Sequence, residues 1–430
     1  MAVRRKRTTR NQTNPRDTAA SQLAKTPTGI KGFDEVTFGG LPKGRPALVA
    51  GQAGSGKTLF AMEFLVRGAL EFNEPGVLMS FEETADELVK NFTSLGFDIP
   101  GLMKRNLLTI DFVSVQREHI EETGEYDLEG LFIRLDYAIK SIKARRVVLD
   151  TIEALFSGLQ NEAILRAELR RLFRWLKSRG VTAVITGERG KDTITRHGLE
   201  EYVADCVVVL DHLVNERIAT RRMRIVKYRG SFHGMDEYPF LITERGLSVL
   251  PITSSRLEHK VSNERVSSGI PRLDTMLDGD GFYRGTSILV SGTPGTGKST
   301  LAAHFAKAAC NRGDRVLYFA FEEAPNQIVR NMQSVGLDLT ACLRDGTLRI
   351  DSRRPTMWGL ELHLASIHRE IADYKPSIVI IDPISNLSSI GSSNEVRSML
   401  TRLIDFIKNS GITSLFTELV ADTRNSSAIP

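Results

Sequence analysis

The sequence predicts an α/β protein built from two similar units, each with a mostly parallel sheet and helices on both faces. Short apolar runs, such as residues 47–50 and 77–81, alternate with longer amphipathic stretches, as is typical of such sheets. The motif G-x-x-x-x-G-K-[ST] occurs twice, at residues 51–58 and 292–299. Because the sequence around the second copy repeats the sequence around the first, we expect tandem domains.

Each copy of this motif lies between an apolar run and an amphipathic stretch, which is the strand–loop–helix context of a phosphate-binding loop. Its glycines let backbone N–H groups turn inward around a phosphate, and the helix N-terminus adds a favourable partial charge. The lysine would reach the β- and γ-phosphates, and the hydroxyl after it would ligate Mg²⁺. The predicted contacts to a nucleoside triphosphate are Gly51, Gly54, Ser55, Gly56, Lys57 and Thr58, and Gly292, Gly295, Thr296, Gly297, Lys298 and Ser299.

The repeat extends well beyond these loops, with an offset of about 240 residues at its start and about 230 at its end. The first half continues through two strand-like segments, residues 205–210 and 223–229, which have no counterpart before residue 430. We therefore expect an incomplete second domain with an unpaired, apolar sheet edge. The matching segments are 28–34 and 268–274, 81–83 and 321–323, 147–150 and 379–382, and 185–188 and 415–418, with Glu188 matched to Glu418.

The composition is that of a globular protein large enough for two domains. We expect a disordered basic tail over residues 1–25, a first domain over 26–255 and a truncated second domain over 256–430. The tail is either a solvated extension or a contact for nucleic acid or an acidic partner. No apolar run approaches the ~20 residues of a membrane span, and no secretory signal is present, so we expect a cytoplasmic chain without a membrane partner.

Acidic residues follow the predicted strands, at the sheet edge where ligands of such folds bind. Asp150 and its counterpart Asp382 end apolar strands and are placed to hold Mg²⁺, together with Thr58 and Ser299. Two adjacent pairs, Glu82 with Glu83 and Glu322 with Glu323, are candidates for activating the water that attacks a γ-phosphate. The alternative is that both members of the first pair cap a helix beginning near Thr84.

The segment from residue 227 to residue 233 carries Lys227, Arg229 and His233. The two cations stand two residues apart, so they project from the same face of a strand. This arrangement suits contact with a phosphate bound to a neighbouring subunit. It equally suits a solvated strand edge protected by charge, and the residues alone do not decide between the two.

Taken together, these motifs resemble the KaiC family, circadian-clock ATPases and autokinases with two RecA-like domains. The resemblance spans residues 20–430 and rests on the Ser/Thr-Gly-Ile-x-x-x-Asp segments, the Phe-Glu-Glu segments and Lys-x-Arg-Gly-x-x-His. It implies a homohexameric ring with ATP and Mg²⁺ bound between subunits and with regulatory protein partners. It also implies catalysis by Glu82, Glu83, Glu322 and Glu323. Contacts to ATP across the interface would come from Lys227, Arg229 and the His233 segment.

In this family the first domain is a slow ATPase and the second is a serine/threonine autokinase. The second half of this sequence lacks a Lys-x-Arg-Gly segment. Ser426 and Ser427 lie near the family's phosphoacceptor position but are not matched to it. The resemblance therefore supports the ATPase activity more strongly than the kinase activity. A RecA-like, DNA-dependent ATPase of recombination or repair is the alternative, and a nucleotide-gated scaffold is another. Nucleic acid is an unlikely partner because the net charge of +5 is spread out and no basic stripe with interleaved aromatic residues lies outside the tail.

Overall fold

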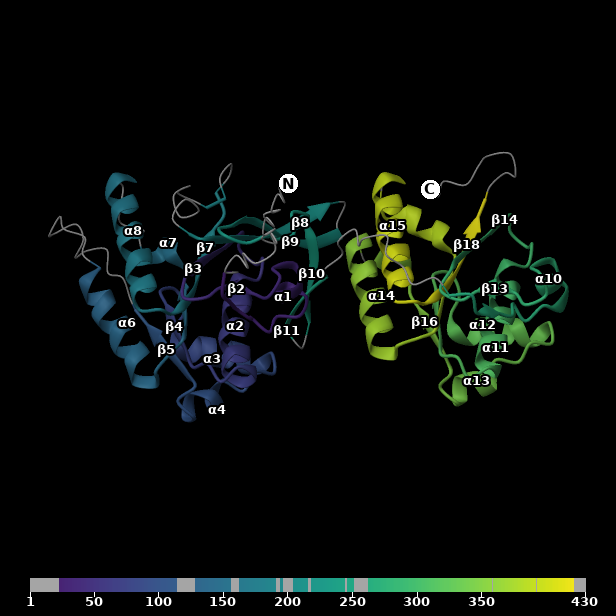
Figure 1. Cartoon of the computed structure of the whole chain (residues 1–430), viewed down its shortest axis with the longest axis horizontal. Helices are drawn as coiled ribbons and strands as arrows, with labels where there is room; N and C mark the ends of the chain where they lie inside the picture. The colour runs from purple at the N-terminus through teal and green to yellow at the C-terminus, as the bar shows by residue number, and fades with distance from the viewer. Residues whose placement is uncertain are drawn as a thin grey trace, which may run out of the picture.

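The computed structural model shows two α/β units, which lie side by side along the long axis of the molecule in Figure 1. We call residues 23–250 the first unit and residues 262–420 the second unit. None of the helices in the described parts of the chain is long and apolar enough to cross a membrane. The structure describes residues 23–113, 128–155, 162–190, 194–195, 204–215, 218–243, 246–250, 262–357, 359–391 and 393–420.

Strands and helices alternate through most of the first unit, as the sequence predicts. Its elements are β1 (Lys25–Thr26), α1 (Phe33–Val36), β2 (Leu41–Pro42), β3 (Pro46–Gly51), α2 (Lys57–Glu71), β4 (Gly76–Ser80), α3 (Ala85–Ser94), α4 (Ile99–Lys104), β5 (Leu108–Phe112), α6 (Glu129–Ile142), β6 (Arg146–Asp150), α7 (Ile152–Leu155), α8 (Glu162–Ser178), β7 (Thr182–Glu188), β8 (Cys206–Asn215), β9 (Ile218–Tyr228), β10 (Tyr238–Thr243) and β11 (Gly246–Val249).

The second unit repeats the same order of elements up to its last described strand. It consists of β12 (Arg265–Val266), α10 (Pro271–Met276), β13 (Phe282–Tyr283), β14 (Ser287–Gly292), α11 (Lys298–Asn311), β15 (Val316–Ala320), α12 (Pro325–Ser334), α13 (Thr340–Arg344), β16 (Leu348–Ser352), η1 (Pro355–Met357), α14 (Leu360–Tyr374), β17 (Ile378–Asp382), η2 (Ile384–Ser389), α15 (Ser393–Asn409) and β18 (Thr413–Leu419).

The sheet of the first unit has the order β11-β10-β9-β8-β3-β7-β6-β4-β5 within the described residues. Its strands from β8 to β5 are all parallel, and β9, β10 and β11 extend it by antiparallel pairing. Strand β3 therefore lies in the interior of the sheet, between β8 and β7. Parallel sheets are buried on both faces, which explains why the four apolar residues 47–50 on β3 are fully buried.

The sheet of the second unit has the order β14-β18-β17-β15-β16, and every pairing in it is parallel. This order matches β3-β7-β6-β4-β5 of the first unit. Strand β14 therefore lies at an edge of the described sheet, as the sequence predicts. Its side chains are correspondingly less buried, and 42 % of Leu289 is exposed.

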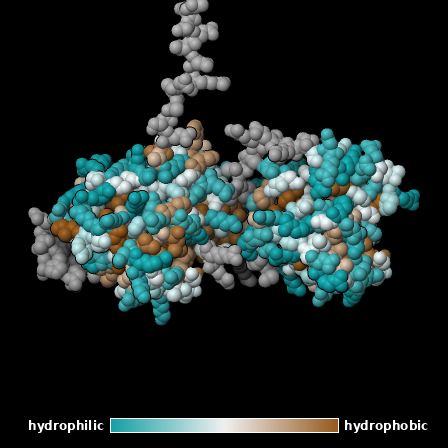
Figure 2. All heavy atoms as spheres, turned by 60° about the horizontal axis from the view of Figure 1, so that its bottom comes forward, coloured by the Kyte–Doolittle hydropathy of each residue, from teal (hydrophilic) through white to brown (hydrophobic). Residues whose placement is uncertain are grey.

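Helices cover both faces of each sheet. In the first unit, α2, α3 and α4 pack on one face, and α6 and α8 pack on the other, each face with its own apolar cluster. In the second unit, α11, α12 and α13 lie opposite α14 and α15 in the same way (Figure 1). On the face shown in Figure 2, hydrophilic residues cover most of both units, with hydrophobic residues visible in smaller patches between them.

The structure differs from the sequence prediction in two details. Residues 23–25 belong to the described structure: Lys25 pairs with Pro42, and its ammonium donates to the carbonyl oxygen of Thr37 (2.5 Å) and lies over the ring of Tyr228. The prediction placed Lys25 at the end of the basic tail. Residues 1–22 lie outside the described part of the chain.

The match of Glu188 to Glu418 is also out by one residue. In the first sheet Glu188 lies opposite Gly51 of the phosphate-loop strand. In the second sheet Glu418 lies opposite Ser291, one residue earlier, and Leu419 takes the position equivalent to Glu188. Since strand side chains alternate between faces, the two glutamates project to opposite sides of their sheets and have different roles.

The Ser/Thr-Gly-Ile-x-x-x-Asp segments are structural. The carboxylate of Asp34 accepts hydrogen bonds from the backbone N–H groups of Thr28 and Gly29 and from the Thr28 hydroxyl. In the second unit, Asp274 accepts one hydrogen bond from the backbone N–H of Ser268 and one from the Ser267 hydroxyl. The aspartate thus closes a loop in each unit at some distance along the chain from the phosphate loop.

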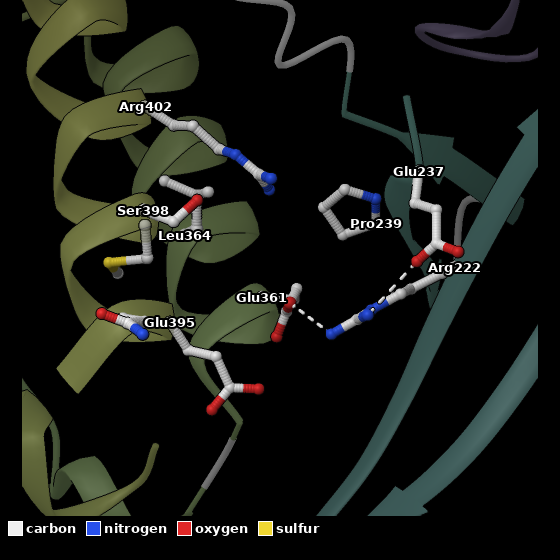
Figure 3. Close-up of a pocket in the computed structure, with 10 residues that line it drawn as sticks. Arg222, Glu237, Pro239, Glu361, Leu364, Glu395, Ser398 and Arg402 are labelled. Atoms are coloured by element: carbon white, nitrogen blue, oxygen red, sulfur yellow. Dashed lines mark hydrogen bonds and ion pairs between the residues drawn. The ribbon is translucent and has the colours of Figure 1, made fainter. Parts of the chain in front are cut away.

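The two units contact each other through ionic and apolar side chains. Arg222 on β9 donates to Glu237 of its own unit (3.2 Å) and to Glu361 on α14 of the second unit (2.8 Å). Leu250 of the first unit is buried in the apolar cluster of α14 and α15. A cavity of about 270 Å³ lies beside this bridge, and Figure 3 shows Arg402 of α15 pointing toward it.

Candidate phosphate and metal site

The phosphate loop of the first unit connects the C-terminal end of β3 to the N-terminus of α2. Gly54 (φ 73°) and Gly56 (φ 101°) adopt left-handed backbone conformations that side chains disfavour. A Cβ on Gly51 would lie 2.4 Å from Ser55 Oγ and 2.5 Å from the Leu210 carbonyl oxygen, so only glycine fits there. The geometry explains why these glycines recur at fixed spacing.

The loop lysines of the two units adopt the same conformation. Lys57 Nζ donates to the carbonyl oxygens of Gly51 (2.9 Å) and Gln52 (3.0 Å). In the second unit, Lys298 Nζ donates to Gly292 at 3.0 Å and to the next carbonyl oxygen at 2.7 Å. Each largely buried ammonium thus lies directly against the loop whose N–H groups would surround a phosphate.

Ser55, at the centre of the first loop, supports the same interpretation. The residue is fully buried, and its Oγ makes no hydrogen bond to any atom that the structure describes. Buried hydroxyls are rarely left without a partner, so a polar ligand is expected beside it. Its counterpart Thr296 donates instead to the carbonyl oxygen of Thr293 (2.8 Å).

Asp150 ends β6 beside the first loop and is only 6 % exposed. Its carboxylate accepts a hydrogen bond from Thr186 on β7, and Thr58, the hydroxyl predicted to ligate Mg²⁺, lies near enough to act on its pKa. Burial raises the pKa of Asp150, and the hydroxyls of Thr186 and Thr58 oppose this shift. Carboxylate and hydroxyl oxygens are the ligands that Mg²⁺ prefers, so the residues present fit this ion.

Asp382 ends β17 at the equivalent position but has a different set of partners. Thr417 on β18 donates to its Oδ1, as Thr186 does to Asp150 in the first unit. Its Oδ2 accepts a hydrogen bond from the hydroxyl of Tyr318 on β15 (2.5 Å).

Glu82 and Glu83 follow β4 in an irregular turn and face different neighbours. The Thr151 hydroxyl donates to Glu82 Oε1 (2.8 Å). Asn91 on α3 donates to Glu83 Oε2 (3.2 Å). Glu82 is exposed and Glu83 is half-buried. Thr151 directly follows Asp150, so the Glu82 carboxylate is connected to the residue next to the metal-site aspartate.

Neither glutamate caps the helix that follows. The side chain of Thr84 accepts a hydrogen bond from the backbone N–H of Glu87, and the Glu87 carboxylate accepts one from the backbone N–H of Thr84. This capping box satisfies the start of α3 by itself. The interpretation of Glu82 and Glu83 as helix caps is therefore wrong.

The second unit repeats one of these two glutamate contacts. Asn331 on α12 donates to both carboxylate oxygens of Glu323 (3.3 and 3.5 Å), as Asn91 does to Glu83. The residue after Asp382 is Pro383, which has no hydroxyl to offer. Glu322 is exposed and lacks the contact that orients Glu82 in the first unit.

Lys227, Arg229 and His233 lie far from the phosphate loop of their own unit. Lys227 pairs with Val207 on β8, near the end of the sheet where β3 begins. Val207 lies opposite Leu48, so the loop at the other end of β3 begins three residues, or ~10 Å, further along the strands. Arg229 forms an ion pair with Asp205 (3.4 Å), and the ring of His233 lies against Tyr228.

Sequence reasoning did not single out Thr151, Thr417 or Tyr318, although all three contact predicted site residues. Thr417 could have been predicted from a correct alignment of the two halves, because it lies at the position equivalent to Thr186. Thr151 and Tyr318 carry none, because each occurs in one unit only: Pro383 and Leu78 stand at the other positions. Ser426 and Ser427 lie outside the described residues.

Comparison with known proteins identifies the family. The ATPase family model described as KaiC matches residues 26–254 and 266–429, which together cover most of the chain. The chain belongs to the KaiC family. Its domains are the tandem α/β domains of that family, and it is a nucleotide-binding ATPase by membership. The DNA-dependent alternative is not favoured.

Individual KaiC relatives match along nearly the whole chain. A circadian clock protein KaiC2 of Synechocystis sp. is 58% identical over 397 residues, which are 92% of this chain and 70% of that protein. The circadian clock oscillator protein KaiC of Thermostichus vulcanus is 40% identical over 97% of this chain and 81% of its own length. KaiC of Synechococcus elongatus is 40% identical over 95% of this chain and 79% of its own length.

Proposed function

We propose that the first unit hydrolyses Mg²⁺-bound ATP at interfaces between subunits of a homohexameric ring. The observation that carries this proposal is the convergence of Lys57, Thr58, Asp150 and Glu82 at one end of four adjacent strands, β3, β7, β6 and β4. Thr186 donates to Asp150, and Thr151 donates to Glu82. Residues 26–255 and 256–430 are proposed as the two domains. The second unit would bind ATP and Mg²⁺ through its own loop, Ser299 and Asp382.

Binding of ATP would use the loop N–H groups and the ammonium of Lys57. Thr58 and Asp150 would hold Mg²⁺, which neutralises charge on the β- and γ-phosphates when bound. The nearness of Thr58 to Asp150 supports this pairing, because it places the two oxygen ligands of the ion together. The buried Asp150 carboxylate also provides negative charge where a cation compensates the cost of burial.

Glu82 is the proposed general base. It is exposed, so a water molecule can reach its carboxylate, and Thr151 restrains one oxygen so that the other is available to accept a proton. Glu83 is proposed as its supporting carboxylate, held by Asn91. We extend the same assignment to Glu322 and Glu323, with Asn331 holding the second of them.

Lys227 and Arg229 are proposed to contact the γ-phosphate of a neighbouring subunit, with the His233 segment alongside. Their position at the end of the sheet opposite the loop supports this, since neither side chain spans that distance within one subunit. In a head-to-tail ring the two opposite ends of the sheet meet at each interface. The Asp205 contact would hold Arg229 in place for that role.

The base assignment is tested with Glu82→Gln in the full chain. We expect ATP hydrolysis at the first unit to fall by about 100-fold or more, since a general base contributes roughly 10²–10⁴-fold. ATP binding should be retained, because glutamine keeps the size of the side chain. Glu87→Gln, which alters only the helix cap, is the matched control. A Glu82→Gln protein that hydrolyses ATP at the original rate would contradict the assignment.

A mixing experiment tests the contact between subunits. Glu82→Gln and Arg229→Ala proteins, each inactive alone, are mixed under conditions that exchange subunits. Interfaces that combine an intact Glu82 with an intact Arg229 from a neighbour should then recover part of the activity. If Arg229 acts within its own subunit, no mixed interface gains activity, and the mixture stays as slow as its components.

We further propose that the chain acts in circadian-type regulation with protein partners, as the names of its relatives indicate. Autokinase activity of the second unit is the second candidate, and the resemblance of the chain to the KaiC family supports it. Incubation with γ-labelled ATP separates the two activities. Label released as phosphate reports the ATPase, whereas label retained on the protein reports the autokinase.

A further inference from the structure

We propose that Tyr318 is a positioning residue that occupies the metal-site carboxylate of the second unit and raises the Mg²⁺ concentration that its nucleotide binding requires. This inference rests on the proposed role of Asp382 in holding that ion. The observation behind it is the 2.5 Å hydrogen bond from the Tyr318 hydroxyl to Asp382 Oδ2.

Sheet register explains how the tyrosine reaches this carboxylate. Tyr318 on β15 lies opposite Ile380 on β17, two residues before Asp382. Two residues span ~6.6 Å along a strand, which is close to the length of a phenol side chain, so the hydroxyl reaches the diagonal neighbour. The Tyr318 side chain is 1 % exposed, so its packing fixes the hydroxyl in place.

The same position in the first unit holds Leu78, which lies opposite Val148 on β6, again two residues before the aspartate. Leucine has no donor. The Asp150 carboxylate accepts its hydrogen bond from Thr186 and lies near the loop hydroxyl of Thr58. The strand pairing is the same in the two units here, so the change from leucine to tyrosine accounts for the added donor at Asp382.

With Tyr318 present, both oxygens of Asp382 have fixed partners on neighbouring strands, since Thr417 binds Oδ1. Ser299 is exposed, whereas Thr58 is half-buried. A hydrogen bond to a charged carboxylate is stronger than one between neutral groups, and it withdraws charge and lone pairs from other ligands. A cation or its bound water must compete with the phenol for Oδ2.

The test measures nucleotide binding rather than turnover. The full chain carries Lys57→Ala, so that only the second unit binds, and a fluorescent, slowly hydrolysed ATP analogue is titrated at a series of Mg²⁺ concentrations and in EDTA. We expect Tyr318→Phe to lower the Mg²⁺ concentration at half-maximal binding by about 3- to 10-fold. Affinity in EDTA should stay the same, whereas a general packing defect would change it.

Two further variants complete the design. Tyr318→Leu, which copies the first unit, should shift the Mg²⁺ midpoint in the same direction. Tyr374→Phe removes another tyrosine hydroxyl of the same unit, one that donates to the Gly346 carbonyl oxygen, and should leave the midpoint unchanged. If the Mg²⁺ concentration at half-maximal binding is the same for the protein with Tyr318 and for the Tyr318→Phe variant, this inference is wrong, but the proposed role of Asp382 still stands. Binding that is indifferent to Mg²⁺ even with Tyr318 present overturns the proposed role of Asp382 as well.

Discussion

The two phosphate-loop strands have nearly the same sequence pattern but very different surroundings. Strand β3 is paired on both sides, and its apolar residues are fully buried. Strand β14 has a partner on one side only within the described sheet, and its side chains are partly exposed. The loops themselves nevertheless agree, down to the two carbonyl contacts of each lysine. The loop geometry therefore does not depend on burial of the strand that leads into it.

The residues around the loops show the opposite behaviour. Thr151 orients Glu82 in the first unit, whereas Pro383 follows the aspartate in the second. Tyr318 binds Asp382, whereas Leu78 leaves Asp150 to Thr58 and Thr186. A repeated motif thus preserves nucleotide binding more strictly than it preserves the groups that act on the nucleotide. We expect hydrolysis to be concentrated in the first unit for this reason.

The largest expected effect comes from placing a charge on the two strands at equivalent positions. Leu48→Lys puts an ammonium into a fully buried site, so it should lower the free energy of unfolding by about 4 kcal/mol or more. Leu289→Lys, at a side chain that is 42 % exposed, should cost about 1 kcal/mol or less. Thermal unfolding of both variants gives the comparison. Equal destabilisation would show that β14 is as well covered as β3.

A smaller effect is expected from Thr151→Val, which keeps the volume of the side chain but removes the donor to Glu82. The kcat of ATP hydrolysis should fall by about 5- to 10-fold, as one hydrogen bond of ~1 kcal/mol is lost, with little change in nucleotide affinity. Thr93→Val removes an exposed hydroxyl that binds only the Val89 carbonyl oxygen, and it serves as the control. An unchanged kcat for Thr151→Val would mean that Glu82 needs no such restraint.

The two units are also expected to differ in their response to pH. Burial lowers the pKa of His363 and lowers that of His368 to about 4, and both lie on α14 of the second unit. A histidine kept neutral by folding favours the folded state above its ordinary pKa near 6.5, and this contribution is lost as the pH falls from about 6.5 toward 4. We expect the second unit to lose roughly 1–2 kcal/mol more than the first between pH 7 and pH 5.

Hydrogen exchange, followed separately for peptides of α14 and of α6, measures this difference. The variant His368→Leu should remove a large part of the extra loss in the second unit, because leucine does not titrate. An equal loss of stability in both units as the pH falls would contradict this prediction.

The sequence predicted the features that depend on local geometry. These include the phosphate loop from Gly51 to Thr58 and the position of Asp150 at the end of its strand. It also predicted the edge position of β14 in the described sheet, because residues 205–210 have no counterpart in the second half of the sequence. The match of Glu188 to Glu418 was wrong, because a shift of one residue changes strand register without changing composition. The Tyr318 contact lay out of reach, because it joins residues 64 positions apart on non-consecutive strands.

The central claim is that the first unit is the principal hydrolytic site, and ATP turnover of Lys57→Ala and Lys298→Ala in otherwise identical full-length chains tests it most directly. Each variant removes the ammonium from one loop and leaves the other site intact. We predict that Lys57→Ala loses nearly all phosphate release, whereas Lys298→Ala keeps half or more of the original rate. Phosphate release that survives Lys57→Ala and disappears in Lys298→Ala would contradict the claim.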